Sequence, residues 1–340
     1  MTRYILGRLL STVVVILVVI TASLWLTRQA PSNPCLKERE ANTCACVKAN
    51  HLDRPVFPVY VGEPLPPTPG CDYWKPRRRI AIGPLKFVGI REWSDTQYAL
   101  YLKTLLSGSL GDSMKTDLTV VETLKAGLPY TIQLGFQALL IALFLGIPAG
   151  LYAGLKQNTL SDYATMTVAM VGVSVPNIVL GPLLIMLFSL KLGWFTAVGW
   201  NKWADSVLPS LTLGLYYAAY VARLTRGGML EIIRKDFIRT ARAKGLSERV
   251  VVFRHALKGA LLPVVSYLGP ALAALLTGSV VVEEIFSLPG IGTHFVRSAL
   301  NRDYNLVLGT IILYASVLVV LNMVVDVLYT FLDPRVSYDQ

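Results

Sequence analysis

The chain has 340 residues, of which 54% are hydrophobic and only 16% are charged, and its mean hydropathy is +0.53. Soluble domains carry about a quarter charged residues, so this composition excludes an ordinary soluble domain. The formal net charge of +11 does not indicate a nucleic-acid-binding protein, because the excess Lys and Arg lies beside apolar runs and not on a soluble domain.

Six runs without charged side chains follow one another along the chain. A helix of about 20 apolar residues spans a bilayer core, and six runs are close to that length, the fourth being the shortest. They lie between Arg8 and Arg28, Lys125 and Lys156, Asp162 and Lys191, Asp205 and Arg223, Lys258 and Glu283, and Asp303 and Asp326. The sequence therefore predicts an all-α integral membrane protein with six transmembrane helices.

The first run makes residues 1–28 the first transmembrane helix. Met1-Thr2-Arg3 and Arg8 precede the run, as in a signal peptide. The run is longer than the apolar segment of a signal peptide, which has about 7–15 residues, and no small-x-small cleavage site follows it. We therefore expect a retained anchor with a cytoplasmic N-terminus, and counting six spans from there places the C-terminus in the cytoplasm as well.

Residues 29–128 then form a long extracytoplasmic loop after the first helix. Its first part, residues 31–84, is rich in proline and has little periodicity, which indicates an irregular loop or a small extracytoplasmic module. Apolar residues at helical spacing predict an amphipathic helix from about Trp93 to Leu106. The sequence Gly108-Ser109-Leu110-Gly111-Asp112-Ser113 then breaks this helix.

All four cysteines of the chain lie in this outer segment, at Cys35, Cys44, Cys46 and Cys71. That distribution favours disulfides in an oxidising compartment. Cys44 and Cys46 are expected to pair elsewhere, because a ring closed over one intervening residue is strained. The alternative is a zinc site that uses Cys44, Cys46 and His51, but this spacing matches no common zinc site, and no metal site is predicted.

The loop from Arg223 to Lys258 carries ten Lys and Arg residues against three acids. Short loops rich in Lys and Arg stay on the cytoplasmic side, and counting spans from the N-terminus gives the same side. Residues 231–239 can form an amphipathic helix, and the small side chains of Ala241 and Ala243 would let another protein approach closely. Gly245 would allow the positive φ that ends a short helix.

Several kinds of chemistry are missing from the chain. No phosphate-binding loop of the form Gly-x-x-x-x-Gly-Lys-Ser/Thr occurs, and no catalytic constellation can be assembled. Asp326 is the one ionisable candidate inside a span, and a structural role is favoured for it over a proton relay. Glu283 and Glu284 are interpreted as a solvated helix end, with a substrate-facing role as the alternative. Such a protein is a passive channel, or it draws energy from a partner.

The loop residues resemble the coupling loop of ABC-importer permease subunits, in particular the oligopeptide/dipeptide branch. The similarity rests on Thr240-Ala241-Arg242-Ala243-Lys244-Gly245-Leu246, on residues 254–258 and on Leu261-Leu262-Pro263. Arg239, Thr240 and Ala241 stand where the general importer motif has Glu-Ala-Ala, and Pro263 comes later than its closing proline, as in the peptide branch. Similar segments are residues 108–113, 155–158, 174–176, 283–292, 301–304 and 326–334. The resemblance covers about 1–28 and 93–340, and residues 32–84 look like an insertion.

The resemblance implies the fold of a type I ABC importer, with a core permease domain at 129–340. It implies a bacterial inner-membrane protein that pairs with a second homologous permease, two ATPase subunits and an extracytoplasmic binding protein. ATP and Mg²⁺ would be bound by the ATPases, and this chain would hold no cofactor. The expected coupling residues are Arg239, Thr240, Ala241, Arg242, Ala243, Lys244, Gly245 and Leu246, and the candidate path or gate residues are Pro176, Gly278 and Glu283. Prolines within the spans, at Pro148, Pro176, Pro182 and Pro270, could act as bends for the transport motion or as fixed kinks.

Three functions are compared on this basis. The favoured one is ATP-driven import of peptides, with nickel, glutathione or another small solute as alternatives of the same class. An autonomous channel or ion-coupled carrier would need charges at the membrane midplane or an inverted repeat, and neither is found. A membrane anchor for an outer binding module would leave the coupling loop unexplained.

Overall fold

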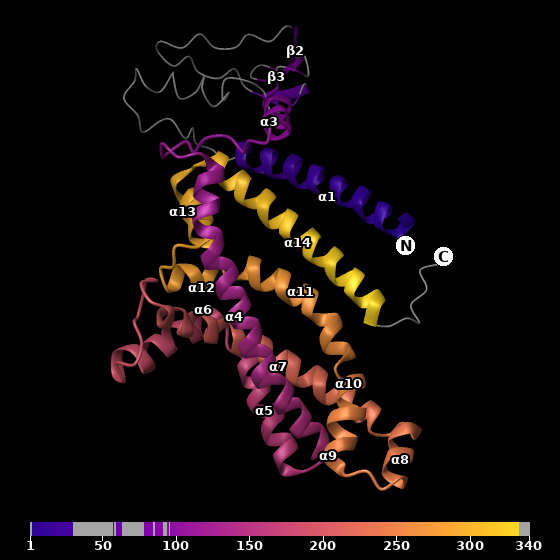
Figure 1. The fold of residues 1–340 in the computed structure, drawn as a ribbon. Coiled ribbons are helices and arrows are strands. Elements are labelled where there is room, and N and C mark those ends of the chain that lie inside the picture. The colour runs from indigo at the N-terminus through magenta and orange to yellow at the C-terminus, as the bar shows by residue number, and fades with distance from the viewer. Residues whose placement is uncertain are drawn as a thin grey trace. The chain divides into compact units, whose positions relative to one another are not determined.

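The computed structural model describes residues 2–29, 57, 59–62, 78–83, 86–90, 94 and 96–332. The described chain is mostly helical (Figure 1). It divides into two compact units, one made of residues 1–5, 127–293 and 316–340 and the other of residues 6–126 and 294–315. The predicted division into 1–28, 29–128 and 129–340 is of another kind, because it separates segments that lie in the membrane from a segment outside it. It stays a prediction.

The helices occupy the predicted apolar runs and the short segments between them. In the first half of the chain they are α1 (Thr2–Gln29), α3 (Gln97–Leu106), α4 (Val120–Leu155), α5 (Leu160–Ser174), α6 (Asn177–Leu184) and the π-helical segment η2 (Ile185–Lys191). In the second half they are the 3₁₀ turn η3 (Trp203–Ser206), α7 (Val207–Ile232), α8 (Asp236–Ala243), α9 (Glu248–Val250), the π-helical segment η4 (Val251–Ala256), α10 (Leu257–Ala260), α11 (Leu262–Gly278), α12 (Val280–Ile285), α13 (Ile291–Asn301) and α14 (Tyr304–Leu332).

The outer segment contains a small antiparallel sheet that was not predicted from the sequence. Its strands are β1 (Val59–Gly62), β2 (Arg78–Gly83) and β3 (Lys86–Ile90), in the order β1-β3-β2. Ile90 pairs with Val59 on one side and with Arg78 on the other. The strands have only four to six residues, too few for a clear period among the prolines. The described residues of this part therefore include a sheet, and the rest of residues 31–84 lies outside the described residues.

The amphipathic helix of the outer segment is confirmed as α3. Thr96 caps it, with its Oγ1 accepting a hydrogen bond from the amide of Ala99 at 3.2 Å. Tyr98 is buried in a cluster with Ile20 and Leu24 of α1 and with Leu308 and Ile312 of α14. After the helix, residues 108 and 111 are glycines with positive φ, so the predicted break is also confirmed.

The third apolar run is not one straight helix. α5 and the pair of α6 and η2 are bent by 102° at the break between Ser174 and Asn177. Pro176 causes the break, because a proline disfavours helical backbone in the residue before it, and Val175 is accordingly extended with φ −85° and ψ 115°. The third run therefore folds as two helical pieces with a sharp bend at Pro176, one of the prolines at which a bend or kink is predicted.

Three described helices are long and apolar enough to cross a membrane: α4, α11 together with α12, and the stretch Tyr304–Val324 of α14. The bent pair of α5 with α6 and η2 would make a fourth, and α1 contributes a shorter apolar stretch, Ser11–Thr27. Only 39% of the most apolar window of α4 and 28% of that of α14 is buried within the chain. Large apolar faces are thus left for a lipid or protein environment, and the count of six spans stays a prediction.

Glycines let α4 and α7 approach each other closely. Gly146, Gly150 and Gly154 recur every four residues and therefore share one face of α4. A Cβ on Gly146 would lie 2.6 Å from the carbonyl oxygen of Ala218, one on Gly150 would overlap the backbone of Ala222, and one on Gly154 would lie 2.7 Å from Cβ of Met229. Such small residues at every fourth position are typical of helix pairs packed in membranes.

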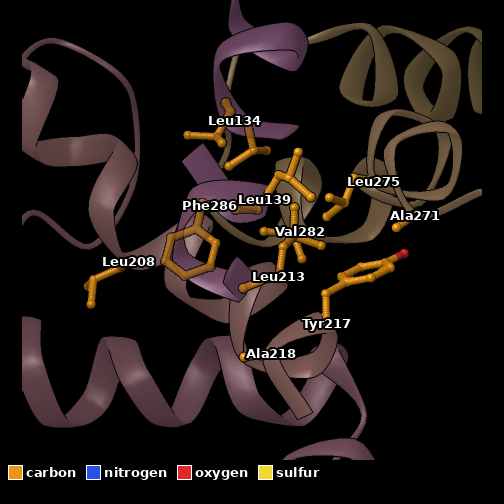
Figure 2. Close-up of a cluster of buried hydrophobic side chains, with 13 residues drawn as sticks. Leu134, Leu139, Leu208, Leu213, Tyr217, Ala218, Ala271, Leu275, Val282 and Phe286 are labelled. Atoms are coloured by element: carbon orange, nitrogen blue, oxygen red, sulfur yellow. The ribbon is translucent and has the colours of Figure 1, made fainter. Parts of the chain in front are cut away.

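The main apolar cluster joins α4, α7, α11 and α12 (Figure 2). Leu134, Leu213, Leu275 and Phe286 are each no more than 1% exposed, and Figure 2 shows Tyr217 at the margin of this group.

Candidate functional site

The loop of residues 223–258 folds into short helices and is not a flexible connection. α7 continues to Ile232, a three-residue turn follows, and α8 runs from Asp236 to Ala243. The predicted helix over residues 231–239 is therefore wrong in its bounds. The chain turns at residues 233–235, where the amide of Lys235 donates to the carbonyl of Ile232 at 3.0 Å, and the residues Thr240 to Ala243 are helical.

Gly245 ends α8 in the conformation that the sequence predicts. Its φ is +78°, its amide donates to the carbonyl of Arg242 at 2.9 Å, and the amide of Leu246 donates to the carbonyl of Ala241 at 3.4 Å. This pair of bonds satisfies two of the last carbonyls of the helix and is the Schellman type of helix end. A side chain at residue 245 would meet nothing within 4 Å, so the backbone conformation alone requires glycine there.

One face of α8 packs on the rest of the chain. Ile238 is fully buried and Ala241 is 7% exposed, and they form a cluster with Met229, Val251, Ala256 and Ala260. The small side chain of Ala241 therefore serves packing within this chain, and the expectation that it admits a partner's surface is wrong. Ala243 is exposed, and its contact with a partner stays a prediction.

The other face of α8 is open to solvent and mixes apolar and basic side chains. Phe237 is 50% exposed and Leu246 is 40% exposed, and Arg239, Thr240, Arg242 and Lys244 are exposed as well. Arg242 donates two hydrogen bonds to Glu248, at 2.8 and 3.2 Å. This exposed pair contributes little stability by itself, but it links α8 to α9 across the turn at Gly245.

An ion pair at the beginning of the loop of residues 223–258 ties α7 to the start of α5. Arg226 donates to both carboxylate oxygens of Asp162 at 2.7 Å, and the Asp162 side chain is fully buried whereas that of Arg226 is 27% exposed. Asp162 also accepts from the amide of Asn158 at 3.0 Å. Asn158 has a φ of +60°, which turns the chain between α4 and α5. Three helices are thereby fixed to one another where the loop begins.

Glu283 lies inside the protein and not at a solvated helix end. It is 1% exposed, and three donors meet its carboxylate: the hydroxyls of Thr131 (2.9 Å) and Ser279 (2.7 Å) and the amide of Gly292 (2.7 Å). Thr131 in turn accepts from the amide of Ile291 at 2.9 Å. The solvated reading is wrong for Glu283, because its helix end is covered by the start of α13, and it fits Glu284, which is exposed.

The glycines that follow α12 make room for this carboxylate. A Cβ on Gly290 would overlap the carboxylate of Glu283, and one on Gly292 would lie 2.5 Å from Cα of Val280. We refer to Thr131, Ser279, Glu283, Ile291 and Gly292 as the Glu283 cluster. It joins α4, α12 and α13 through hydrogen bonds.

The structure does not gather the other candidate residues into one site. Pro176 is exposed at the corner between α5 and α6, and Gly278 is the last residue of α11. α6 packs on α12, where a Cβ on Gly181 would lie 3.3 Å from Ile285. The path or gate role of Pro176, Gly278 and Glu283 stays a prediction. Cys35, Cys44, Cys46 and Cys71 lie outside the described residues, so their disulfides stay a prediction too.

No group of three or more His, Cys, Asp or Glu side chains that could hold a metal ion occurs among the residues that the structure describes. Two features were missed from the sequence: the Glu283 cluster, and the glycine face of α4, whose signal was the four-residue spacing of Gly146, Gly150 and Gly154.

Comparisons with known proteins agree on one class. The family described as "Binding-protein-dependent transport system inner membrane component" matches residues 146–338. The oligopeptide transport system permease protein OppB of Salmonella typhimurium is 41% identical over 99% of this chain and 100% of its own length. The dipeptide transport system permease protein DppB of Bacillus subtilis is 35% identical over 99% of this chain and 98% of its own length.

Solved structures match the fold. A chain of the MetNI methionine ABC transporter in an inward-facing conformation matches with a TM-score of 0.52 and 18% identity, covering 62% of this chain and 96% of that one. A second crystal form of the same transporter gives a TM-score of 0.50 and 20% identity, covering 63% and 97%. The resemblance found in the sequence is thereby confirmed, and the chain belongs to the family of binding-protein-dependent transport system inner membrane components.

Proposed function

We propose that this chain is a membrane-spanning subunit of an ATP-driven importer for peptides. The observation that carries the proposal is its similarity, over 99% of its length, to the oligopeptide and dipeptide permease proteins. A binding protein would deliver the peptide from outside, and a second homologous permease would complete the path. Separate ATPase subunits would bind and hydrolyse ATP with Mg²⁺, and this chain would hold no cofactor. Both termini and the loop of residues 223–258 would face the cytoplasm.

The exposed face of α8 would be the contact with one ATPase. The two faces of α8 support this. On one face, Ile238 and Ala241 pack against Met229 of α7. On the other face, Phe237, Arg239 and Arg242 are exposed and can contact a partner. Apolar side chains at the centre of an interface and Arg at its edge are typical of protein contacts. Closure of the ATPases would then move α8 together with the helices beneath it, as in rigid-body switching.

The coupling role is tested by disturbing the turn at residue 245 that ends α8, while the exposed side chains of α8 are left unchanged. In the importer reconstituted with its partner subunits, Gly245→Val forces a β-branched residue into the left-handed region, which costs about 1–2 kcal/mol or more and should unfold the turn. We expect loss of peptide uptake while the subunit still inserts and assembles. Gly245→Asn should retain uptake, because Asn tolerates positive φ.

Gly227 supplies the matched control. It is an exposed glycine of α7 without a positive φ, and a Cβ added to it would meet nothing within 4 Å, so Gly227→Val should leave uptake near its original rate. Normal peptide uptake by Gly245→Val would contradict the coupling role. Uptake of nickel or glutathione, in place of di- or oligopeptides, by the unmodified importer would contradict the peptide assignment and leave the coupling role intact.

A further inference from the structure

Residues 191–206 connect the end of η2 to the start of α7, and their aromatic side chains point in two directions. Phe195 and Trp200 pack inward against the main apolar cluster, and the ring of Trp200 lies 5.4 Å from a tyrosine ring of α4. Trp194 and Trp203 are in contrast 66% and 70% exposed. We refer to residues 191–206 as the outer turn, because counting spans from a cytoplasmic N-terminus places them outside.

Hydrogen bonds hold the backbone of the outer turn in place. The carboxylate of Asp205, which is buried, accepts from the amides of Asn201 and Lys202 at 2.8 Å each. The amide of Gly199 donates to the carbonyl of Phe286, just after α12, at 2.8 Å, and Gly199 reaches this position with a φ of +91°. The fold therefore fixes the outer turn on the ends of α7 and α12.

The exposed apolar surface of η2 continues into the outer turn. Met186 and Leu190 of η2 are exposed, the latter by 73%, and the exposed Leu192 and Trp194 follow directly. Apolar side chains exposed to this extent are unfavourable in water, and they suit the hydrocarbon that surrounds an inner-membrane protein. The apolar run ends at Lys191, so the outer turn is expected to begin where the hydrocarbon ends.

The side chains that follow the apolar run add positive charge. Between Asp162 and Asp205 the chain has no acidic residue, and Lys191 and Lys202 are its two basic ones. Both lysines are exposed, and within the described part of the chain neither forms an ion pair. The amides of Lys202 and Asn201 hold the pKa of Asp205 below its ordinary value, and the charge of Lys202 contributes less to this. The two ammonium groups are thus available to an external anion.

We propose that the outer turn binds phospholipid headgroups, with Trp194 and Trp203 inserted at headgroup level and Lys191 and Lys202 contacting lipid phosphates. This rests on the proposed membrane-spanning function and adds a lipid partner to it. Tryptophan suits this depth because its ring is apolar and its N–H is polar. Lysine beside a membrane surface is attracted to anionic lipids. Because the outer turn is bonded to the ends of α7 and α12, bound lipid would hold both ends at the bilayer surface.

The competing occupant is the soluble binding protein, and the sequence positions favour lipid. Trp194 comes three residues after Lys191, which ends one apolar run, and Trp203 comes two residues before Asp205, after which the next run begins. Both exposed rings are therefore tied closely to the ends of apolar helices. The tryptophans of a surface that docks a soluble protein would have to stand clear of the bilayer, and the short outer turn leaves them little length to do so.

The direct test is photo-cross-linking in the complete importer with its binding protein. The importer carries Trp203→p-benzoylphenylalanine, which keeps an aromatic side chain, and is placed in nanodiscs of phosphatidylglycerol and phosphatidylcholine in equal amounts, each with its own isotope label. We expect illumination to attach lipid to this subunit. The same probe at Trp194 gives a second position. The matched control has the probe at Phe253, an exposed aromatic residue of the loop of residues 223–258, and should attach little lipid.

A second measurement addresses the phosphate contact. Each lysine close to a membrane surface favours an anionic over a neutral lipid by about five-fold, so the probe at residue 203 should attach phosphatidylglycerol at least about five-fold more than phosphatidylcholine. Lys191→Gln combined with Lys202→Gln should make the two lipids equal. Lys258→Gln, at an exposed lysine of the loop of residues 223–258, should leave the preference unchanged.

The outcomes separate the lipid partner from the other occupants and from the proposed function. Lipid attached at residue 203 and not at residue 253, with a preference that needs the two lysines, supports the proposal. Attachment to the binding protein or to the second permease in place of lipid would overturn it, and so would an anionic preference that survives the loss of both lysines. If the unmodified importer takes up no peptide while residue 203 still attaches lipid, the proposed function fails and the lipid contact stands.

Discussion

Replacing Glu283 by alanine should be among the most destabilising single changes in the membrane part of the chain. The carboxylate is 1% exposed and accepts from Thr131, Ser279 and Gly292. Ser279 has a second acceptor in the carbonyl of Leu276 at 3.2 Å, so its hydroxyl can turn away. The amide of Gly292 cannot turn. A buried donor without a partner costs about 1–3 kcal/mol, and the lost side-chain volume adds a cavity, so we expect a loss of about 3 kcal/mol.

The assay is thermal unfolding of the purified subunit in lipid nanodiscs, followed by tryptophan fluorescence. For a chain of this size, a loss of about 3 kcal/mol corresponds to a fall in Tm of about 5 °C. The Tm of Glu283→Gln should lie between those of the unmodified subunit and of Glu283→Ala. The glutamine amide oxygen can still accept from the amide of Gly292, and its amide nitrogen can donate to the hydroxyls of Thr131 and Ser279. Glu284→Ala is the control at the neighbouring exposed carboxylate, and it should change stability by less than about 0.5 kcal/mol. Equal unfolding temperatures for Glu283→Ala and Glu284→Ala would refute the reasoning.

Three further predictions follow from the packing and from the sequence. Arg226→Ala should destabilise the subunit by about 2 kcal/mol or more, because it leaves the buried carboxylate of Asp162 unpaired, whereas Arg234→Ala, at an exposed arginine, should be neutral in the same unfolding assay. Gly150→Ala should lower the free energy of unfolding by about 1–3 kcal/mol, because the added Cβ forces α4 away from α7. The control Gly172→Ala, whose Cβ would meet its nearest neighbour at 3.7 Å, should be neutral or stabilising. Equal effects of the two changes would contradict the close packing of α4 on α7. A thiol reagent that cannot cross membranes should label Cys35, Cys44, Cys46 and Cys71 in intact cells only after reduction, and free labelling without reductant would exclude the disulfides.

Local signals in the sequence were reliable where one residue type decides the backbone. Gly245 follows a short helical stretch and adopts the positive φ expected of it, and the spacing of Tyr98, Tyr101 and Leu105 defines α3. Long apolar runs correctly predicted α4, α11 with α12, and α14 as helices apolar enough to cross a membrane, because hydrophobicity over about 20 residues needs no knowledge of neighbours.

Predictions failed where the outcome depends on which face of an element meets its neighbours. Ala241 is small and was assigned to a partner, but the register of α8 turns it toward Met229 and Val251. Glu283 is one of two adjacent acids, and only the fold decides that it is covered by Gly292 while Glu284 stays exposed. A single sequence assigns charge and size to a position, but it does not give the direction in which the side chain points.

The packing of α8 on α7 has a mechanical consequence. Met229 belongs to α7 and shares a buried cluster with Ile238 of α8, so the two helices form one stiff arm. α7 has 26 residues and is thus about 39 Å long, and a tilt of about 5° at one end displaces the other by about 3 Å. A tilt imposed at the loop would thereby be transmitted along the whole length of α7.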